Sequence, residues 1–324
     1  MVRLGLDTFS LRSQPWTPFQ QLDFCATWGI EVVHYSEVRL IGGLEPAHLQ
    51  RLRAYADERG VQLELGMLSI CPSSVIFDAS LGTAEEQIEK MLAPARLLGS
   101  PFVRCVVGAI EDRTRPGGIE QRIEDTLRVL KQVRSRVTDA GLKLAVENHA
   151  GDMQARELKA LVEAAGTDLV GVCVDAGNAV WSMEDPHLLL DTLAPYVLTS
   201  HTRDSTVWDT AEGTAVYWTR MGACNVGIGA YLREFIEKCP GRPLSLETIV
   251  IPEPRMMRHR DEAFWDGYRN MPAWEFARFL ALSKDAPPLA CDPFEPSAAR
   301  ELADVEASLR WTKAFLAELA QSGR

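Results

Sequence analysis

The stretch LKLAVENHAG, residues 142–151, begins as an apolar strand and ends in three residues that are costly to bury. It follows residues 119–141, an amphipathic helical pattern that ends in glycine, as helices often do. A strand end needs turn residues, but it does not need a carboxylate and an imidazole on one face of the pleat, as Glu147 and His149 are. The stretch therefore predicts a helix–strand unit whose end carries chemistry.

Short apolar runs of the same kind recur along the chain and alternate with longer helical patterns. The other seven cover residues 2–9, 30–36, 61–68, 101–108, 169–178, 196–205 and 242–250. Strand and helix alternating eight times indicate parallel βαβ units, and eight such units predict a closed (β/α)8 TIM barrel. We assign this α/β barrel to residues 1–285 as a single domain.

Two regions exceed the eight units. Residues 204–229 and 251–272 are predicted to be long, aromatic-rich loops above the barrel mouth, which close over a substrate or dock a neighbouring subunit. Their aromatic side chains could stack on a sugar ring or pack between the loops. Residues 286–324 are predicted to form a C-terminal extension, a linker followed by one amphipathic helix that packs on the barrel.

The composition restricts the class of protein. The 324 residues are 46% hydrophobic and 24% charged, enough for a sizeable core, and the formal net charge of -11 argues against a nucleic-acid partner. No signal-like segment or 18-residue apolar run is present, so no membrane association is expected. Seven cysteines without a CxxC pair indicate free thiols in a reducing compartment, and we expect a cytoplasmic protein.

Catalytic residues of a parallel barrel lie at the carboxyl ends of its strands. The alternation of side chains turns Glu147, Asp175, His201 and Glu247, from four consecutive strands, toward the barrel axis. Singly, each could be a cap, a turn residue or a core histidine. Together, three carboxylates and an imidazole would repel unless they took up protons or shared a cation. They predict a site for Mn²⁺, Mg²⁺, Co²⁺ or Zn²⁺.

Other polar residues near these ends have two interpretations each. His149 could be a general base that is free of the metal, or it could orient Glu147. Arg203 could hold a substrate carboxylate or phosphate, or pair with a neighbouring aspartate. Arg104 could line the same pocket or pair with a core carboxylate. His34 is expected to face the barrel mouth.

Four motifs resemble those of a known family. Residues 146–151 (VENHAG), 174–178 (VDAGN), 200–205 (SHTRDS) and 246–248 (LET) are similar to the metal-binding strand ends of the sugar phosphate isomerase/epimerase family, also called xylose-isomerase-like TIM barrels. The resemblance covers about residues 1–285. It implies one divalent cation held by the matching Glu, Asp, His and Glu, with the two glutamates also moving protons.

The resemblance carries these roles to numbered residues of this chain. Asn178 departs from the pattern, because some relatives have a histidine there. The implied metal ligands are Glu147, Asp175, His201 and Glu247; the candidate catalytic residues are Glu147, Glu247 and His149; and the candidate substrate-binding residues are Arg203, Asn178, Arg104 and His34.

The expected function is a metal-dependent isomerase or epimerase that acts on a sugar, keto-sugar or sugar acid through an enediolate, with Mn²⁺ as the expected ion. The alternative is a lyase on the same barrel, either a decarboxylase of an oxo sugar acid or an eliminase of a 3-oxo-glycoside. Arg203 and the enlarged loops support that alternative. A non-catalytic binding subunit ranks below both. The expected partner is a small carbohydrate, and a homo-oligomer or a partner subunit is left open.

Overall fold

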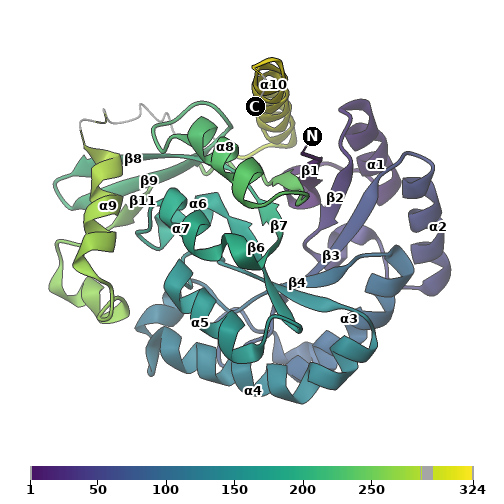
Figure 1. The fold of residues 1–324 in the computed structure, drawn as a ribbon, viewed down its shortest axis with the longest axis horizontal. Coiled ribbons are helices and arrows are strands. Elements are labelled where there is room, and N and C mark those ends of the chain that lie inside the picture. Colours follow the sequence, from purple (N-terminus) through teal and green to yellow (C-terminus); the bar gives the residue numbers. More distant parts are fainter. Residues whose placement is uncertain (1, 285, 287–294, 323–324) are drawn as a thin grey trace.

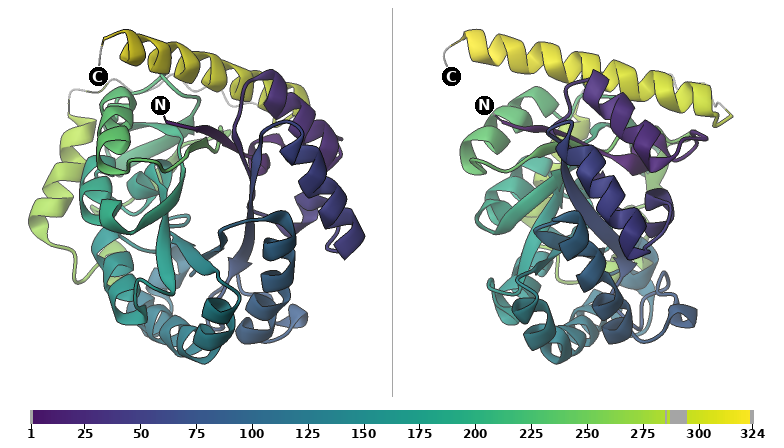
Figure 2. Two further views of the ribbon diagram at one scale, coloured as in Figure 1. Left: turned by 45° about the vertical axis from the view of Figure 1, so that its right-hand side comes forward. Right: turned by 90° about the vertical axis from the view of Figure 1, so that its right-hand side faces the viewer.

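A computed structural model describes residues 2–284, 286 and 295–322 of the chain. Eight parallel strands form a barrel in the order β10-β1-β2-β3-β4-β5-β6-β7, surrounded by helices (Figures 1 and 2). Backbone hydrogen bonds from Thr202 to Ser245 and from Glu247 to Thr202 join β7 to β10 and close the ring. The predicted single (β/α)8 barrel with a C-terminal helix is therefore confirmed.

Each of the eight predicted apolar runs coincides with one barrel strand, and only β3 extends past its run, by one residue. The strands are β1 (Leu4–Asp7), β2 (Val32–Tyr35), β3 (Gln62–Ser69), β4 (Phe102–Val106), β5 (Lys143–Glu147), β6 (Val170–Asp175), β7 (Val197–His201) and β10 (Leu244–Leu246). The helices that follow are α1 (Pro18–Thr27), α2 (Pro46–Asp57), α3 (Ala84–Leu98), α4 (Gly118–Asp139), α5 (Ala155–Ala165), α6 (Ala176–Trp181), α7 (Pro186–Leu193), α8 (Ile228–Lys238), α9 (Ala273–Ser283) and α10 (Ala298–Gln321).

Local sequence signals set the ends of these helices. Thr83 and Glu86 form a reciprocal capping box at the start of α3, and Gly99 ends the helix in the left-handed conformation with φ of 70°. The outward strand residues and the inner helix faces form one large apolar core. The inward residues at the carboxyl ends of the strands are polar, and this end of the barrel carries the candidate site.

The two expected loops contain a sheet, so their assignment as loops is wrong. β8 (Asp204–Thr210) and β9 (Gly213–Thr219) form an antiparallel hairpin, and β11 (Arg255–Met257) pairs with β9 beside helix α9 (Figure 1). Both arms of the hairpin are rich in Thr, Val and Trp, which favour strands. Gly213, the first residue of β9 after the turn, has φ of 149°, a conformation that glycine adopts without strain.

The C-terminal helix α10 lies across the end of the molecule that holds the N-terminus (Figure 2). Val305 and Leu309 are buried in the large apolar core, and Glu301 accepts a hydrogen bond of 2.9 Å from the backbone of Ser13. Most of the predicted linker, together with Cys291, lies outside the described residues. The division between barrel and extension at residues 285 and 286 stays a prediction.

The six cysteines that the structure describes are free thiols. Among the described helices, none combines the length and the apolar character that crossing a membrane requires.

The start of α5 is held by a buried carboxylate that gives the fold a pH dependence. Both carboxylate oxygens of Glu184 accept from the backbone N–H of Ala155, at 3.1 and 3.0 Å, and burial raises the pKa of Glu184 to about 8. Between about pH 4.5 and 8 the folded chain holds this proton and the unfolded chain does not. Stability from this group therefore falls as the pH rises through that window.

We predict that Glu184→Gln flattens this dependence, because the amide can still accept from Ala155 but does not titrate. One such group contributes a slope of about 1.4 kcal/mol per pH unit to the free energy of unfolding. Urea unfolding of both proteins between pH 5.5 and 7.5 measures the difference. Parallel pH curves for the two proteins would contradict the assignment.

Candidate metal centre

The structure brings together the four residues predicted as metal ligands. Ligand-type atoms of Glu147, Asp175, His201 and Glu247 all lie within 4.8 Å of one another, and the four side chains are buried. Three of them end barrel strands β5, β6 and β7, and Glu247 follows β10 directly. The alternating direction of side chains along neighbouring strands is therefore sufficient to bring the four side chains together at one height in the barrel.

The ring of His201 is oriented by two different sets of neighbours. Its Nε2 lies 2.9 Å from Oδ2 of Asp7 and 3.0 Å from Nδ1 of His34. Its Nδ1 lies 2.9 Å from Oε2 of Glu147 and has no hydrogen-bond partner among the described residues. A ring with its proton on Nε2, directed at Asp7, leaves the lone pair of Nδ1 available to a cation. Carboxylates commonly fix metal-binding histidines in this way.

The balance of buried charge also fits a divalent ion. Four buried carboxylates, those of the three acidic ligands and of Asp7, face the guanidinium groups of Arg104 and Arg203. With His201 neutral, as a metal ligand must be, two negative charges remain among these groups for a dication to balance. The same excess acts on His201: although burial lowers its pKa, Cys173, Glu147 and Asp7 raise it well above its ordinary value. The residues present fit a divalent metal.

Both arginines pair with ligand carboxylates. Arg104 on β4 contacts Oε2 of Glu147 through Nε at 2.7 Å and Nη2 at 2.6 Å. Arg203, in the connection from β7 to β8, contacts Asp175 and Glu247 through Nη2. The Nε and Nη1 atoms of Arg203 have no hydrogen-bond partner among the described residues, although the side chain is only 2% exposed. Arg203 therefore pairs with carboxylates and still has two free donors.

A cavity of about 230 Å³ lies beside this cluster. Asn178 also reaches it, and its Nδ2 donates to Oε1 of Glu147 at 3.1 Å. The cavity thus joins candidate ligands to candidate substrate-binding groups. Its lining comprises Phe9, Ser36, Glu37, Leu68, Arg104, His149, Ala150, Asn178, Trp181, Arg203, Trp218, Glu247 and Ile249.

His149 lies at the cavity without belonging to the group of metal ligands. Its Nδ1 is 2.8 Å from the carbonyl oxygen of Gly108, and its backbone N–H donates to Asp152 at 2.8 Å. Burial lowers the pKa of His149 to about 4, so the ring is neutral at pH 7. A neutral ring that donates from Nδ1 to Gly108 leaves Nε2 as an acceptor.

His34 lies deeper in the barrel than expected. It is fully buried, its ring lies tilted against that of His201 with centroids 4.7 Å apart, and it is not among the residues that line the cavity. The expected position at the mouth is wrong, because β2 pairs His34 in register with Asp7 and turns both beneath the ligands. Its neighbours indicate a role in holding His201.

Two residues that support the candidate site were not predicted from the sequence. Asp7 ends β1 with the same inward direction as the predicted ligands, so strand parity alone could have found it. Asp152 accepts hydrogen bonds from the backbone of Gly108 and His149, and so fixes the turn that carries His149. The contacts that Gly108 makes with Asp152 and His149 join residues 44 and 41 positions apart and had no sequence signal.

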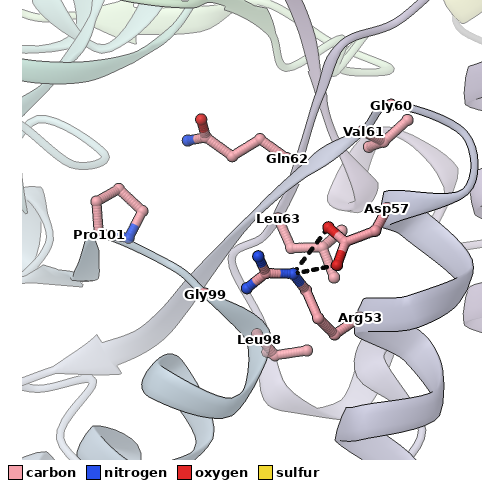
Figure 3. Close-up of a pocket in the computed structure, with 9 residues that line it drawn as sticks. All are labelled: Arg53, Asp57, Gly60, Val61, Gln62, Leu63, Leu98, Gly99 and Pro101. Carbon is pink, nitrogen blue, oxygen red and sulfur yellow. Dashed lines mark hydrogen bonds and ion pairs between the residues drawn. The ribbon is translucent and has the colours of Figure 1, made fainter.

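A second cavity lies elsewhere, between α2 and the start of β3 (Figure 3). It measures about 380 Å³, and its charged groups are Arg53 and Asp57, which pair with each other at 2.8 Å. Because chemistry in this fold takes place at the carboxyl ends of the strands, the cavity in Figure 3 is not the candidate site.

Comparison with known proteins agrees with this geometry. A 3-oxo-isoapionate decarboxylase of Pectobacterium atrosepticum is 26% identical over 183 residues, which span 56% of this chain and 59% of the relative. The structure of an L-ribulose 3-epimerase has a TM-score of 0.64 at 14% identity and covers 100% of this chain and 97% of its own. The IOLI protein, crystallised with a binding zinc atom, has a TM-score of 0.59 at 13% identity over 89% of this chain and 100% of its own.

The two solved structures share the fold. The sequence profile described as the xylose isomerase-like TIM barrel matches residues 22–315, most of the length of the protein. Together with the barrel, this match shows that the chain belongs to the xylose isomerase-like TIM barrel family.

Proposed function

We propose that this protein is a divalent-metal-dependent lyase that decarboxylates a small oxo sugar acid. The observation that carries the proposal is the buried guanidinium of Arg203, with Nε and Nη1 unpaired beside the cavity. A buried donor without a partner is costly, and a charge-assisted hydrogen bond from a guanidinium N–H group to a carboxylate is among the strong ones. The partial match to a decarboxylase supports the same chemistry.

The ligand set Glu147, Asp175, His201 and Glu247 would hold the cation. A bound divalent ion supplies a Lewis acid that polarises a carbonyl group and stabilises the negative charge of an enediolate. Arg203 would hold the substrate carboxylate, so that the bond to the departing carbon dioxide is aligned with the carbonyl group. The electrons of that bond pass into the enediolate as carbon dioxide leaves.

The proton that replaces carbon dioxide needs a route that avoids the ligand carboxylates. Burial would raise the pKa of Glu147, but Arg104 and His201 hold it well below its usual value. His149 is neutral, free of the ligand set and next to the cavity. Its Nε2 would accept a proton from a substrate hydroxyl or from water and deliver it to carbon.

Isomerisation or epimerisation through the same enediolate is the second candidate, supported by the two glutamates at the metal centre. This reaction must remove a proton from carbon, and each glutamate is paired with an arginine that weakens it as a base. Decarboxylation needs no such base, which is why we rank it first. The convergence of all four ligand-type residues argues against a non-catalytic binding subunit.

The first test of this proposal concerns the metal, with Mn²⁺ as the leading ion. Purified protein should hold about one divalent ion per chain. Asp175→Ala should lose it, because the remaining donors are too few. Asp57→Ala removes an exposed carboxylate on α2 and serves as the matched control, which should keep the ion. Elemental analysis measures the content, and full metal content in Asp175→Ala would refute the site.

The second test concerns His149. We expect His149→Gln to retain the metal and to slow turnover by about 10²-fold or more, the usual scale for a positioned acid or base. Steady-state kinetics with metal-loaded protein measures this. An unchanged kcat would restrict His149 to a structural role.

The third test separates the two reactions. With a panel of oxo sugar acids in D₂O, a decarboxylase should release carbon dioxide and place one deuterium on the carbon that it leaves. An isomerase or epimerase should release none and exchange deuterium at the carbon that bears the transferred proton. Proton NMR of the product, with a coupled carbon dioxide assay, distinguishes them. Exchange without release would reverse the ranking of the two reactions.

A further inference from the structure

Four side chains form a stacked column that ends at the metal centre. The guanidinium carbon of Arg203 lies 4.2 Å from the ring centroid of Trp218. Trp218 stacks on Trp181 with centroids 3.6 Å apart and an interplanar angle of 7°. The guanidinium carbon of Arg255 lies 4.4 Å from the centroid of Trp181 and closes the outer end. The four residues come from the β7–β8 connection, β9, α6 and β11.

A hydrogen bond and a close backbone contact hold the inner end of the column against the barrel. Nε1 of Trp218 donates to the carbonyl oxygen of Gly177 at 2.7 Å, and Gly177 belongs to the first turn of α6, just after Asp175. A Cβ atom at Gly177 would lie 2.1 Å from Cγ of Arg203. The aliphatic stem of Arg203 therefore packs on bare backbone, while its charged end packs on an indole face.

We infer that Trp218, backed by Trp181, is a positioning residue that holds Arg203 ready for the carboxylate of an anionic substrate. Stacking uses the flat face of the guanidinium group and leaves its N–H groups free to bond in the plane of the group, the unpaired Nε and Nη1 among them. A guanidinium that is already fixed in place can donate to a carboxylate without first ordering a long side chain. The inference rests on the proposed function, because it requires an anionic substrate.

The column also gives a role to the sheet that the sequence did not predict. Trp218 belongs to β9, and Arg255 belongs to β11, which pairs with β9. Arg255 is itself held by an ion pair of 3.3 Å with Glu111, in the loop after β4. The inserted sheet thus places one aromatic wall against the metal centre.

The test compares two probes that differ by one charged group, D-glycerate and glycerol. Calorimetry with the metal-loaded protein should show that the wild type binds D-glycerate more tightly than glycerol. Trp218→Leu should weaken D-glycerate binding about 10-fold, and Trp218→Phe, which keeps an aromatic face, about threefold, the range that a buried cation–π contact supports. Metal content and glycerol binding should stay unchanged in both variants.

A double-mutant cycle separates positioning from general damage to the fold. Arg203→Met should reduce D-glycerate binding to the level of glycerol, and adding Trp218→Leu should then cost nothing more. A further loss of affinity in the double variant would overturn the inference. So would D-glycerate binding of wild-type strength in Trp218→Leu. If Trp218→Leu fails to fold, Trp218→Phe carries the same cycle, with full additivity as the outcome that refutes the inference.

The two proposals fail differently in this experiment. If the wild-type protein binds D-glycerate no better than glycerol, the anionic substrate is wrong, and both proposals fall. If the wild type prefers D-glycerate and the Trp218 variants keep that preference, only the positioning role is wrong.

Discussion

Buried negative charge is the constraint around which the active end of this barrel is arranged. Asp7, Glu147, Asp175 and Glu247 are removed from water within one small volume, and carboxylates in that position need matching positive charge or protons. Arg104 on β4 and Arg203 in the connection from β7 to β8 supply part of it. A divalent ion would supply the remainder, and His201 presents one ring nitrogen to the ligand carboxylates and the other to Asp7.

The groups that pair with the carboxylates, more than the carboxylates themselves, are the basis for ranking the two candidate reactions. Two glutamates at a metal could act as bases, as an isomerase or epimerase requires. In this chain both are paired with guanidinium groups, which favour their ionised, weakly basic form. The same guanidinium groups attract an anion, and Arg203, which lines the cavity, has two N–H groups without a partner among the described residues. This balance of charge is the reason for proposing loss of carbon dioxide ahead of abstraction of a proton.

The inserted sheet contacts the candidate site, although it lies outside the barrel. Helix α8 and barrel strand β10 separate its hairpin, β8 and β9, from β11 in the sequence. Their pairing brings an indole against Arg203 and an arginine against the partner indole. A segment that was predicted to be loops thus forms part of the wall of the cavity.

The sequence by itself determined the eight strands, their parallel order and the convergence of four ligand-type residues. These follow from local periodicity, because the period of two in a strand and the shared direction of parallel strands fix which side chains meet. The sequence left two interpretations open for each arginine. It did not predict the hairpin or the buried position of His34 in the barrel. It also did not predict that Asp7 and Asp152 hold the two histidines of the site in place. Only the tertiary structure decided these, because they depend on contacts such as Arg203 with Glu247 and Trp181 with Trp218, between residues far apart in the chain. Such pairings follow from the packing of whole elements, which no local pattern encodes.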